Sequence, residues 1–171
     1  KIEESYSIKD INSLRINQLA KYFCSIETVE QFQEAIEFSR IRNLPMLFIG
    51  EGSNIVFTKD YEGLVIKNNI YGKIEHDERK VEVSSGENWH HFVNWSLSNE
   101  RYGLENLALI PGTVGASPIQ NIGAYGKEVS AFIKEVKSIN TLTGEARIFS
   151  KDECKFSYRS SVFQNKKEYF I

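Results

Sequence analysis

One stretch of this chain, from Gly103 to Gly126, constrains the fold more than any other. It reads GLENLALIPGTVGASPIQNIGAYG and holds five of the chain's eleven glycines and two of its three prolines. The stretch is nevertheless apolar, because leucines, isoleucines and a valine run through it. Long apolar loops of this kind are uncommon in compact domains unless they are functional. The stretch therefore predicts a buried loop in which the backbone approaches something closely.

The overall composition sets broad limits on the class of protein. The chain has 171 residues, of which 41% are hydrophobic and 26% charged, as in an ordinary soluble globular protein. The net charge of −2 gives no basic footprint for nucleic acid or an anionic membrane. No apolar run approaches the roughly 20 residues of a membrane span. We expect a cytoplasmic, monomeric protein without a nucleic-acid or membrane partner.

The cysteines and histidines offer little for metal or disulfide chemistry. Cys24 and Cys154 lie far apart and form no C-x-x-C pattern, so we expect buried or idle thiols. His90 and His91 are adjacent and diverge by about 100° on a helix, so both cannot face one ion there. We therefore expect no metal site.

The first part of the chain predicts a small parallel βαβ unit. Ser13–Ile16 looks extended and Ala20–Ser25 reads as a buried strand. Thr28, with Gln31 three residues later, predicts a capped helix that Asn43 and Pro45 end. Its predicted apolar face is Val29, Phe32, Ala35 and Ile36. Met46–Ile49 follows as a strand covered on both faces, then residues 60–63 as a turn and Leu64–Ile66 as a strand.

The second part has a different character. Val81 and Val83 alternate with charged residues, as in a strand with one wet face. Glu87 and Asn88 predict the start of a helix that ends at Gly103. The segment from Phe132 to Phe149 predicts a β-hairpin around Gly144. The sequence thus predicts an α+β protein with two lobes, residues 1–67 and 68–171, and a ligand between their glycine-bearing loops.

Residues 50–54, GEGSN, form the glycine loop of the first lobe. Glycines allow positive φ values, so backbone N–H groups can converge on an anion, and Ser53 and Asn54 add neutral donors. The alternative is a tight turn between two strands, and the pentapeptide alone leaves both open. It is no Rossmann fingerprint, because a third glycine is missing.

The long loop of the second lobe is more specific. Pro111-Gly112 fits a type II turn, and residues 115–117 are small where the chain would approach a ligand. Because Ser117 precedes a proline, we expect an extended backbone and a hydroxyl free to point into a cleft. The amides of Gln120 and Asn121 can donate and accept, as the edge of an isoalloxazine requires. We interpret the ligand as a flavin dinucleotide; the alternative is a structural loop packed by its own side chains.

A third candidate segment runs from Phe156 to Phe163. Arg159 carries a permanent charge on a planar fork that suits a carboxylate. Alone, Arg159 would more often be a surface ion-pair partner, and Tyr158 a packing residue. The flanking aromatic residues favour a partly buried position for the pair.

These segments together resemble a known family. GEGSN at 50–54, GENWH at 86–90, the loop at 103–126 and YRSSVF at 158–163 are similar to the UDP-N-acetylenolpyruvoylglucosamine reductases, flavoenzymes of peptidoglycan precursor synthesis. The resemblance implies an α+β FAD-binding fold of the vanillyl-alcohol-oxidase type. It implies non-covalent FAD, since neither glycine loop has a histidine or cysteine for attachment. The implied FAD-binding residues are Gly50, Glu51, Gly52, Ser53, Asn54, Ile110, Pro111, Gly112, Gly115, Ala116, Ser117, Ile119, Gln120, Asn121, Gly123, Ala124 and Tyr125.

The resemblance also implies a reaction. NADPH would reduce FAD, and hydride would pass from the flavin to the enolpyruvyl double bond of UDP-N-acetylenolpyruvoylglucosamine. Arg159 matches the family's active-site arginine, and Tyr158 and Arg159 would bind substrate. The family has a further C-terminal domain that binds the UDP-sugar and donates a proton. We expect that domain to be missing here and this polypeptide alone to be inactive.

Two other hypotheses remain open at this point. The chain could belong to another oxidase or dehydrogenase of the same flavin fold. It could also be a non-catalytic binding module, which would leave the small residues and amides of the long loop unexplained.

Overall fold

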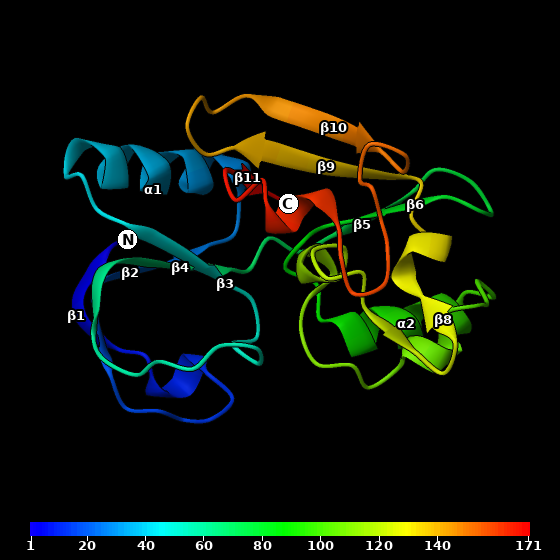
Figure 1. Ribbon diagram of the computed structural model, residues 1–171, viewed down its shortest axis with the longest axis horizontal. Coiled ribbons are helices and arrows are strands. Elements are labelled where there is room, and N and C mark those ends of the chain that lie inside the picture. The colour runs from blue at the N-terminus through cyan, green and yellow to red at the C-terminus, as the bar shows by residue number, and fades with distance from the viewer. The chain divides into compact units, whose positions relative to one another are not determined.

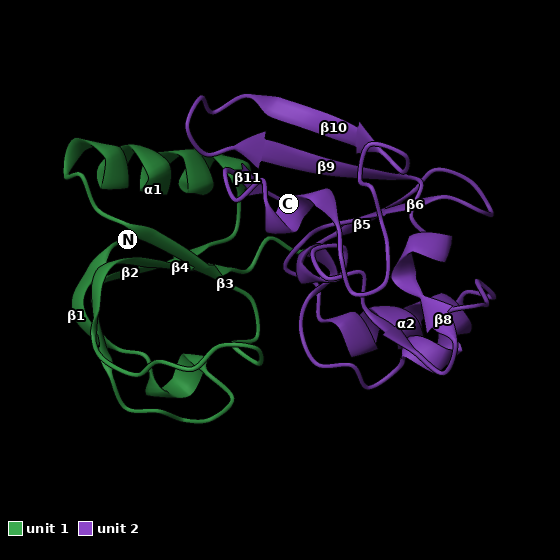
Figure 2. Cartoon of the chain, in the orientation of Figure 1, with its two compact units in different colours: residues 1–71 green, residues 72–171 purple.

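The computed structural model describes residues 1–171, and the chain divides into two compact units. The first unit contains residues 1–71 and the second contains residues 72–171 (Figure 2). The sequence places the boundary at 67/68 instead. The first unit keeps the chain a little longer because the Asn69 N–H donates to the carbonyl of Ile26 and its side-chain amide donates to Ser25.

The first unit is built on a four-stranded sheet in the order β1-β2-β4-β3 (Figure 1). β2 and β3 both pair with β4 in parallel, whereas β1 pairs with β2 antiparallel. The chain between β2 and β3 forms α1, so the expected parallel βαβ unit is present, with β4 inserted between its two strands. The strands are Glu3–Ser7 (β1), Leu19–Ile26 (β2), Met46–Ile49 (β3) and Tyr61–Asn68 (β4).

Helix α1, Val29–Ile41, begins and ends as its sequence predicts. The Thr28 side chain accepts a hydrogen bond from the Gln31 N–H, and the Gln31 side chain accepts one from the Glu27 N–H. At the other end, Asn43 has a φ of 51° and the Leu44 N–H bonds the Ser39 carbonyl. This is a Schellman closure with asparagine in the left-handed position. Val29 is exposed rather than part of the apolar face.

Three local predictions in this unit are wrong: the covering of Met46–Ile49 on both faces, the extended Ser13–Ile16 and the turn at 60–63. β3 is an edge strand and only its last residue is buried, so it is not covered on both faces. Ser13–Ile16 is not a strand, and Arg15 has a positive φ. Residues 61–63 belong to β4 because Gly63 lets the strand lie against Pro45; a Cβ there would be 2.2 Å from the Pro45 carbonyl oxygen.

The second unit is richer in short elements (Figure 1). β9 and β10 form the predicted hairpin, with Gly144 at a φ of 78° in its turn, and β11 pairs with the other edge of β9. Two smaller antiparallel pairs, β5-β6 and β7-β8, complete the strands. The bounds are Lys73–Glu75 (β5), Val81–Val83 (β6), Gly123–Ala124 (β7), Lys127–Glu128 (β8), Glu135–Asn140 (β9), Ala146–Ser150 (β10) and Tyr169–Phe170 (β11).

Helix α2, Trp89–Ser98, begins at the predicted cap and ends earlier than predicted. The Asn88 side chain accepts from the His91 N–H. Glu100 has a φ of 57°, the Glu100 N–H bonds the Leu97 carbonyl and the Arg101 N–H bonds the Ser96 carbonyl. This Schellman motif closes the helix on a glutamate, so Gly103 is not its C-terminal residue.

Candidate functional site

In the loop that follows β3, several backbone N–H groups have no hydrogen-bond partner. The N–H groups of Glu51 to Asn54 donate no hydrogen bond to another residue of the chain. Gly52 has a φ of 63°, and a Cβ on it would lie 2.2 Å from the Ile11 carbonyl oxygen. The Ser13 N–H donates to the Gly52 carbonyl at 3.1 Å. The loop is thus bonded to the segment around Ser13 through the Gly52 carbonyl, and its own N–H donors have no partner within the chain.

A positive charge lies beside this loop. The Lys67 ammonium donates to the Gly50 carbonyl at 2.7 Å. Unpaired N–H groups near a fixed cation suit a phosphate or diphosphate. The alternative of a tight strand-to-strand turn does not hold, since no strand follows until Tyr61. No local sequence motif marks Lys67, so it was not among the predicted site residues.

The long loop has a different character, because much of its backbone is satisfied within its own unit. The Val114 N–H bonds the Glu87 carbonyl at 2.8 Å, and the Gly115 N–H bonds the Ser85 carbonyl at 2.9 Å. Short-range bonds then continue from Ala116 to Ile122. The GENWH segment at 86–90 therefore anchors the long loop. Gln120, within this loop, is exposed.

Several small residues of this loop have partners within the chain. A Cβ on Gly115 would lie 2.4 Å from the Ser85 Cβ, so its close approach is to Ser85. The prediction for Ser117 is wrong: its backbone is helical and its buried hydroxyl donates to the Val114 carbonyl at 2.7 Å. The 3₁₀ helix Val114–Ala116 continues into Ser117, and this outweighs the usual effect of a following proline. Gly112 lies in a bend with a φ of 124°.

Asn121 also has a different role from the one its sequence suggests. It is fully buried, and its amide nitrogen donates to Glu128 Oε2 at 3.0 Å and to the Ser157 carbonyl at 2.9 Å. Its amide oxygen accepts from the Ser130 N–H at 3.1 Å. The side chain is fully engaged inside the protein, so its amide is not available to the edge of a flavin ring.

The third candidate segment is joined directly to the long loop. Ser157 and Ser160 exchange two backbone hydrogen bonds of 3.0 Å, which form a tight hairpin with Arg159 at a φ of 52°. The Arg159 guanidinium donates to the Gly123 carbonyl at 2.7 Å, and the Ser161 hydroxyl donates to the Ile119 carbonyl at 2.7 Å. The structure thus brings Arg159 to the loop that carries the predicted flavin contacts.

The side chains of this hairpin are open to solvent. Tyr158 is 83% exposed, and Arg159 is exposed as well, so the expected partly buried pair is not found. Tyr125 on the long loop is 88% exposed. The Arg159 fork has only one nitrogen engaged, which leaves N–H donors free for an anionic group.

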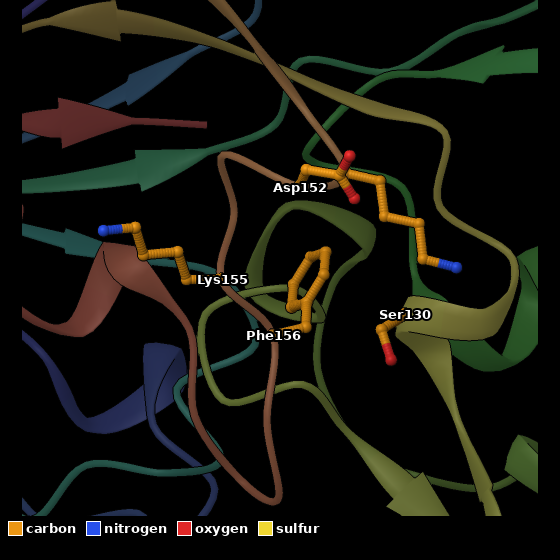
Figure 3. Close-up of a pocket in the computed structure, with 5 residues that line it drawn as sticks. Ser130, Asp152, Lys155 and Phe156 are labelled. Carbon is orange, nitrogen blue, oxygen red and sulfur yellow. The ribbon is translucent and has the colours of Figure 1, made fainter.

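A separate small pocket of about 290 Å³ lies in the second unit (Figure 3). Its lining residues are Ser130, Lys151, Asp152, Lys155 and Phe156. None of these is a predicted cofactor residue, and the volume is at the lower edge of the range for drug-sized ligands. Figure 3 shows the Phe156 ring between the Lys155 side chain and Ser130, with the Asp152 carboxylate near it.

The cysteines and His90 have structural positions within the fold. Burial raises the pKa of the Cys24 and Cys154 thiols to about 11, and both are buried and unpaired, as expected. His90 accepts from the Leu109 N–H at 3.3 Å. No three histidine, cysteine or acidic side chains are grouped to hold a metal ion. None of the helices has the length and apolar character needed to cross a membrane.

Comparison with known proteins extends the resemblance. Residues 20–150 match the family described as FAD binding domain. The UDP-N-acetylenolpyruvoylglucosamine reductase of Bdellovibrio bacteriovorus is 43% identical over 167 residues, which cover 95% of this chain and 50% of the relative. The reductase of Escherichia coli strain K12 is 42% identical over 164 residues, or 94% of this chain and 48% of the relative. The chain therefore spans about half the length of the curated relatives it matches.

Solved structures agree on the fold. The crystal structure of UDP-N-acetylenolpyruvylglucosamine reductase from Thermus caldophilus matches with a TM-score of 0.77 at 24% identity, over 94% of this chain and 56% of that chain. The 6-hydroxy-D-nicotine oxidase of Arthrobacter nicotinovorans matches with a TM-score of 0.61 at 15% identity, over 90% and 36%. The fold is the α+β fold of the vanillyl-alcohol-oxidase and p-cresol-methylhydroxylase type. The chain belongs to the FAD-binding domain family, and its cofactor is FAD.

Proposed function

We propose that this chain is the FAD-binding part of an NADPH-dependent reductase that converts UDP-N-acetylenolpyruvoylglucosamine to UDP-N-acetylmuramate. The observation that carries the proposal is the 43% identity to a reductase of that name across nearly the whole chain. The reaction belongs to peptidoglycan precursor synthesis, and we propose a cytoplasmic, monomeric enzyme. The complete activity is proposed for a protein of the relatives' full length, not for this chain alone.

The open loop after β3 supports non-covalent binding of FAD. Four successive backbone N–H groups without partners, next to the Lys67 ammonium, match the charge and donor needs of a diphosphate. The loop provides neutral backbone donors beside the Lys67 ammonium, its one charged side chain, Glu51, is exposed, and it contains neither histidine nor cysteine. We propose that Gly50, Glu51, Gly52, Ser53 and Asn54 bind the diphosphate.

The long loop supplies the other part of the proposed binding set. Its anchored backbone can support the isoalloxazine without reorganising, and Gln120 keeps an exposed amide for the ring edge. Ser117 and Asn121 are left out of the proposed contacts, because their side-chain polar atoms bond within the chain. The proposed contacts are Ile110, Pro111, Gly112, Gly115, Ala116, Ile119, Gln120, Gly123, Ala124 and Tyr125.

When bound, FAD would supply the hydride-transfer chemistry between NADPH and the enolpyruvyl double bond, and the proton for the neighbouring carbon would come from the C-terminal domain of the full-length reductase. The role we propose for Arg159 is electrostatic. Its free N–H donors would stabilise the negative charge that develops on the enolate and carboxylate of the substrate. Tyr158 would contact the substrate beside it. The hydrogen bond to Gly123 holds the guanidinium at the loop before substrate arrives.

The test uses a protein of the relatives' full length under anaerobic conditions. Flavin reduced by NADPH should be reoxidised by UDP-N-acetylenolpyruvoylglucosamine, with UDP-N-acetylmuramate as product. Reduced flavin that persists in the presence of this substrate would reject the assignment. Arg159→Lys keeps the charge but loses the planar fork, so FAD binding should survive and reoxidation should slow.

A further inference from the structure

The strongest unassigned feature is the buried amide of Asn121. Its side chain bonds three partners in two parts of the chain: Glu128 of β8 with Ser130 of the 3₁₀ helix Val129–Ala131 that directly follows, and Ser157 of the hairpin. Both amide hydrogens donate and the oxygen accepts, so the three partners fix its orientation. Its φ of 43° is a value that asparagine tolerates better than other non-glycine residues.

The hydrogen bond to Ser157 has a direct consequence for Arg159. Ser157 is the first residue of the two-bond hairpin that carries Arg159, and the guanidinium returns to Gly123, two residues after Asn121. Asn121 and Arg159 therefore tie the same hairpin to the same loop at adjacent points. Loss of the buried bond would let the hairpin move relative to the loop, while Arg159 itself stays chemically intact.

We propose that Asn121 is a positioning residue for the reaction and acts through Arg159. This inference rests on the proposed function. Asn121 keeps the Arg159 guanidinium in register with the loop that holds the flavin, and it touches neither hydride donor nor acceptor. A displacement of about 1 Å in such an arrangement can cost about 10²-fold in rate.

The experiment compares variants of the full-length protein. Asn121→Asp is nearly isosteric, but it replaces the amide donors with an oxygen that faces the Glu128 carboxylate and the Ser157 carbonyl. We expect FAD affinity to be retained and the rate of flavin reoxidation by UDP-N-acetylenolpyruvoylglucosamine to fall about 10²-fold. Asn121→Gly, which keeps the positive φ without adding charge, should show the same pattern and serves if Asn121→Asp fails to fold.

Two further variants separate positioning from general structure. In Asn121→Asp with Glu128→Gln, the new amide can donate to the new carboxylate, so part of the lost rate should return. In an Arg159→Ala background, Asn121→Asp should cause no additional loss, because the residue it positions is gone. Asn165→Asp makes the same chemical change at an exposed site outside the long loop and the hairpin, and should behave as wild type.

The outcomes are distinguishable. Normal reoxidation in Asn121→Asp would overturn the positioning role while leaving the proposed function intact. Equal losses of FAD affinity and rate, or a full additional loss in the Arg159→Ala background, would mark Asn121 as merely structural. A wild-type protein whose flavin is not reoxidised by this substrate would reject the proposed function and the positioning role with it.

Discussion

At the scale of single residues, the glycines show where local sequence stops being informative. The sequence suggests that Gly52 allows a positive φ in an anion-binding loop, which it adopts, and that Gly115 is small because a ligand comes close. In the structure, their missing side chains make room for Ile11 and Ser85. Those partners lie about 40 and 30 residues away, so no local spacing could identify them. The role of Asn121 was hidden for the same reason, since Ser157 meets it only in the folded unit.

Gly52→Ala tests whether Gly52 is needed because the Ile11 carbonyl lies against it. Left-handed strain and a clash with the Ile11 carbonyl should together lower the free energy of unfolding by about 2–5 kcal/mol and weaken FAD binding. Gly144→Ala is the matched control, because it has a φ of 78° but open space around its Cβ. It should lose only about 1–2 kcal/mol in urea denaturation. Equal losses in the two variants would mean that crowding at Gly52 is unimportant.

The cysteines give a prediction about pH. Their pKa values of about 11 mean that the folded protein keeps both thiols neutral where unfolded thiols, at about 9, begin to ionise. The resulting stabilisation is complete at pH values below the thiol pKa of the unfolded chain, and it is lost as the pH rises through the folded pKa of about 11. At neutral pH, a thiol reagent should label neither cysteine until denaturant is added. Rapid labelling of the native protein would show that the thiols are accessible.

At the scale of elements, starts were easier to predict than ends. Thr28 and Asn88 mark their helices because a side-chain cap is a local signal. The end of α2 was missed because Glu100 takes the left-handed position that usually requires glycine. β1 and the first residues of β4 were missed because pairing with neighbouring strands, rather than hydrophobic periodicity, defines them.

A mutation at Glu100 can relieve the backbone strain at the C-terminal end of α2. Glu100→Gly should raise the free energy of unfolding by about 0.5–1 kcal/mol, because removal of the left-handed strain exceeds the entropy cost of glycine. Ser98→Gly, within the last turn of the same helix, should instead lower it by about 0.5 kcal/mol. Urea denaturation of both variants provides the comparison. A destabilised Glu100→Gly protein would contradict the assigned closure.

At the scale of the whole molecule, the sequence predicted the α+β class, two units and a flavin. For the fold class and the flavin it succeeded because loop chemistry and motif order carry that information: the GEGSN loop, the long loop and YRSSVF together resemble the reductase family, and two reductases of that name are 43% and 42% identical to this chain. The difference in backbone hydrogen bonding between the two loops could not be predicted from the sequence. One loop offers unpaired backbone donors, whereas the other is a largely satisfied surface tied to Arg159.

The most direct test of this account is a titration of the purified, flavin-free protein with FAD, followed by flavin absorbance and fluorescence. We predict saturation at one FAD per chain, weaker binding in Gly52→Ala, and release of all FAD on denaturation because no covalent bond holds it. A protein that does not bind added FAD, or that retains flavin after denaturation, would contradict the account.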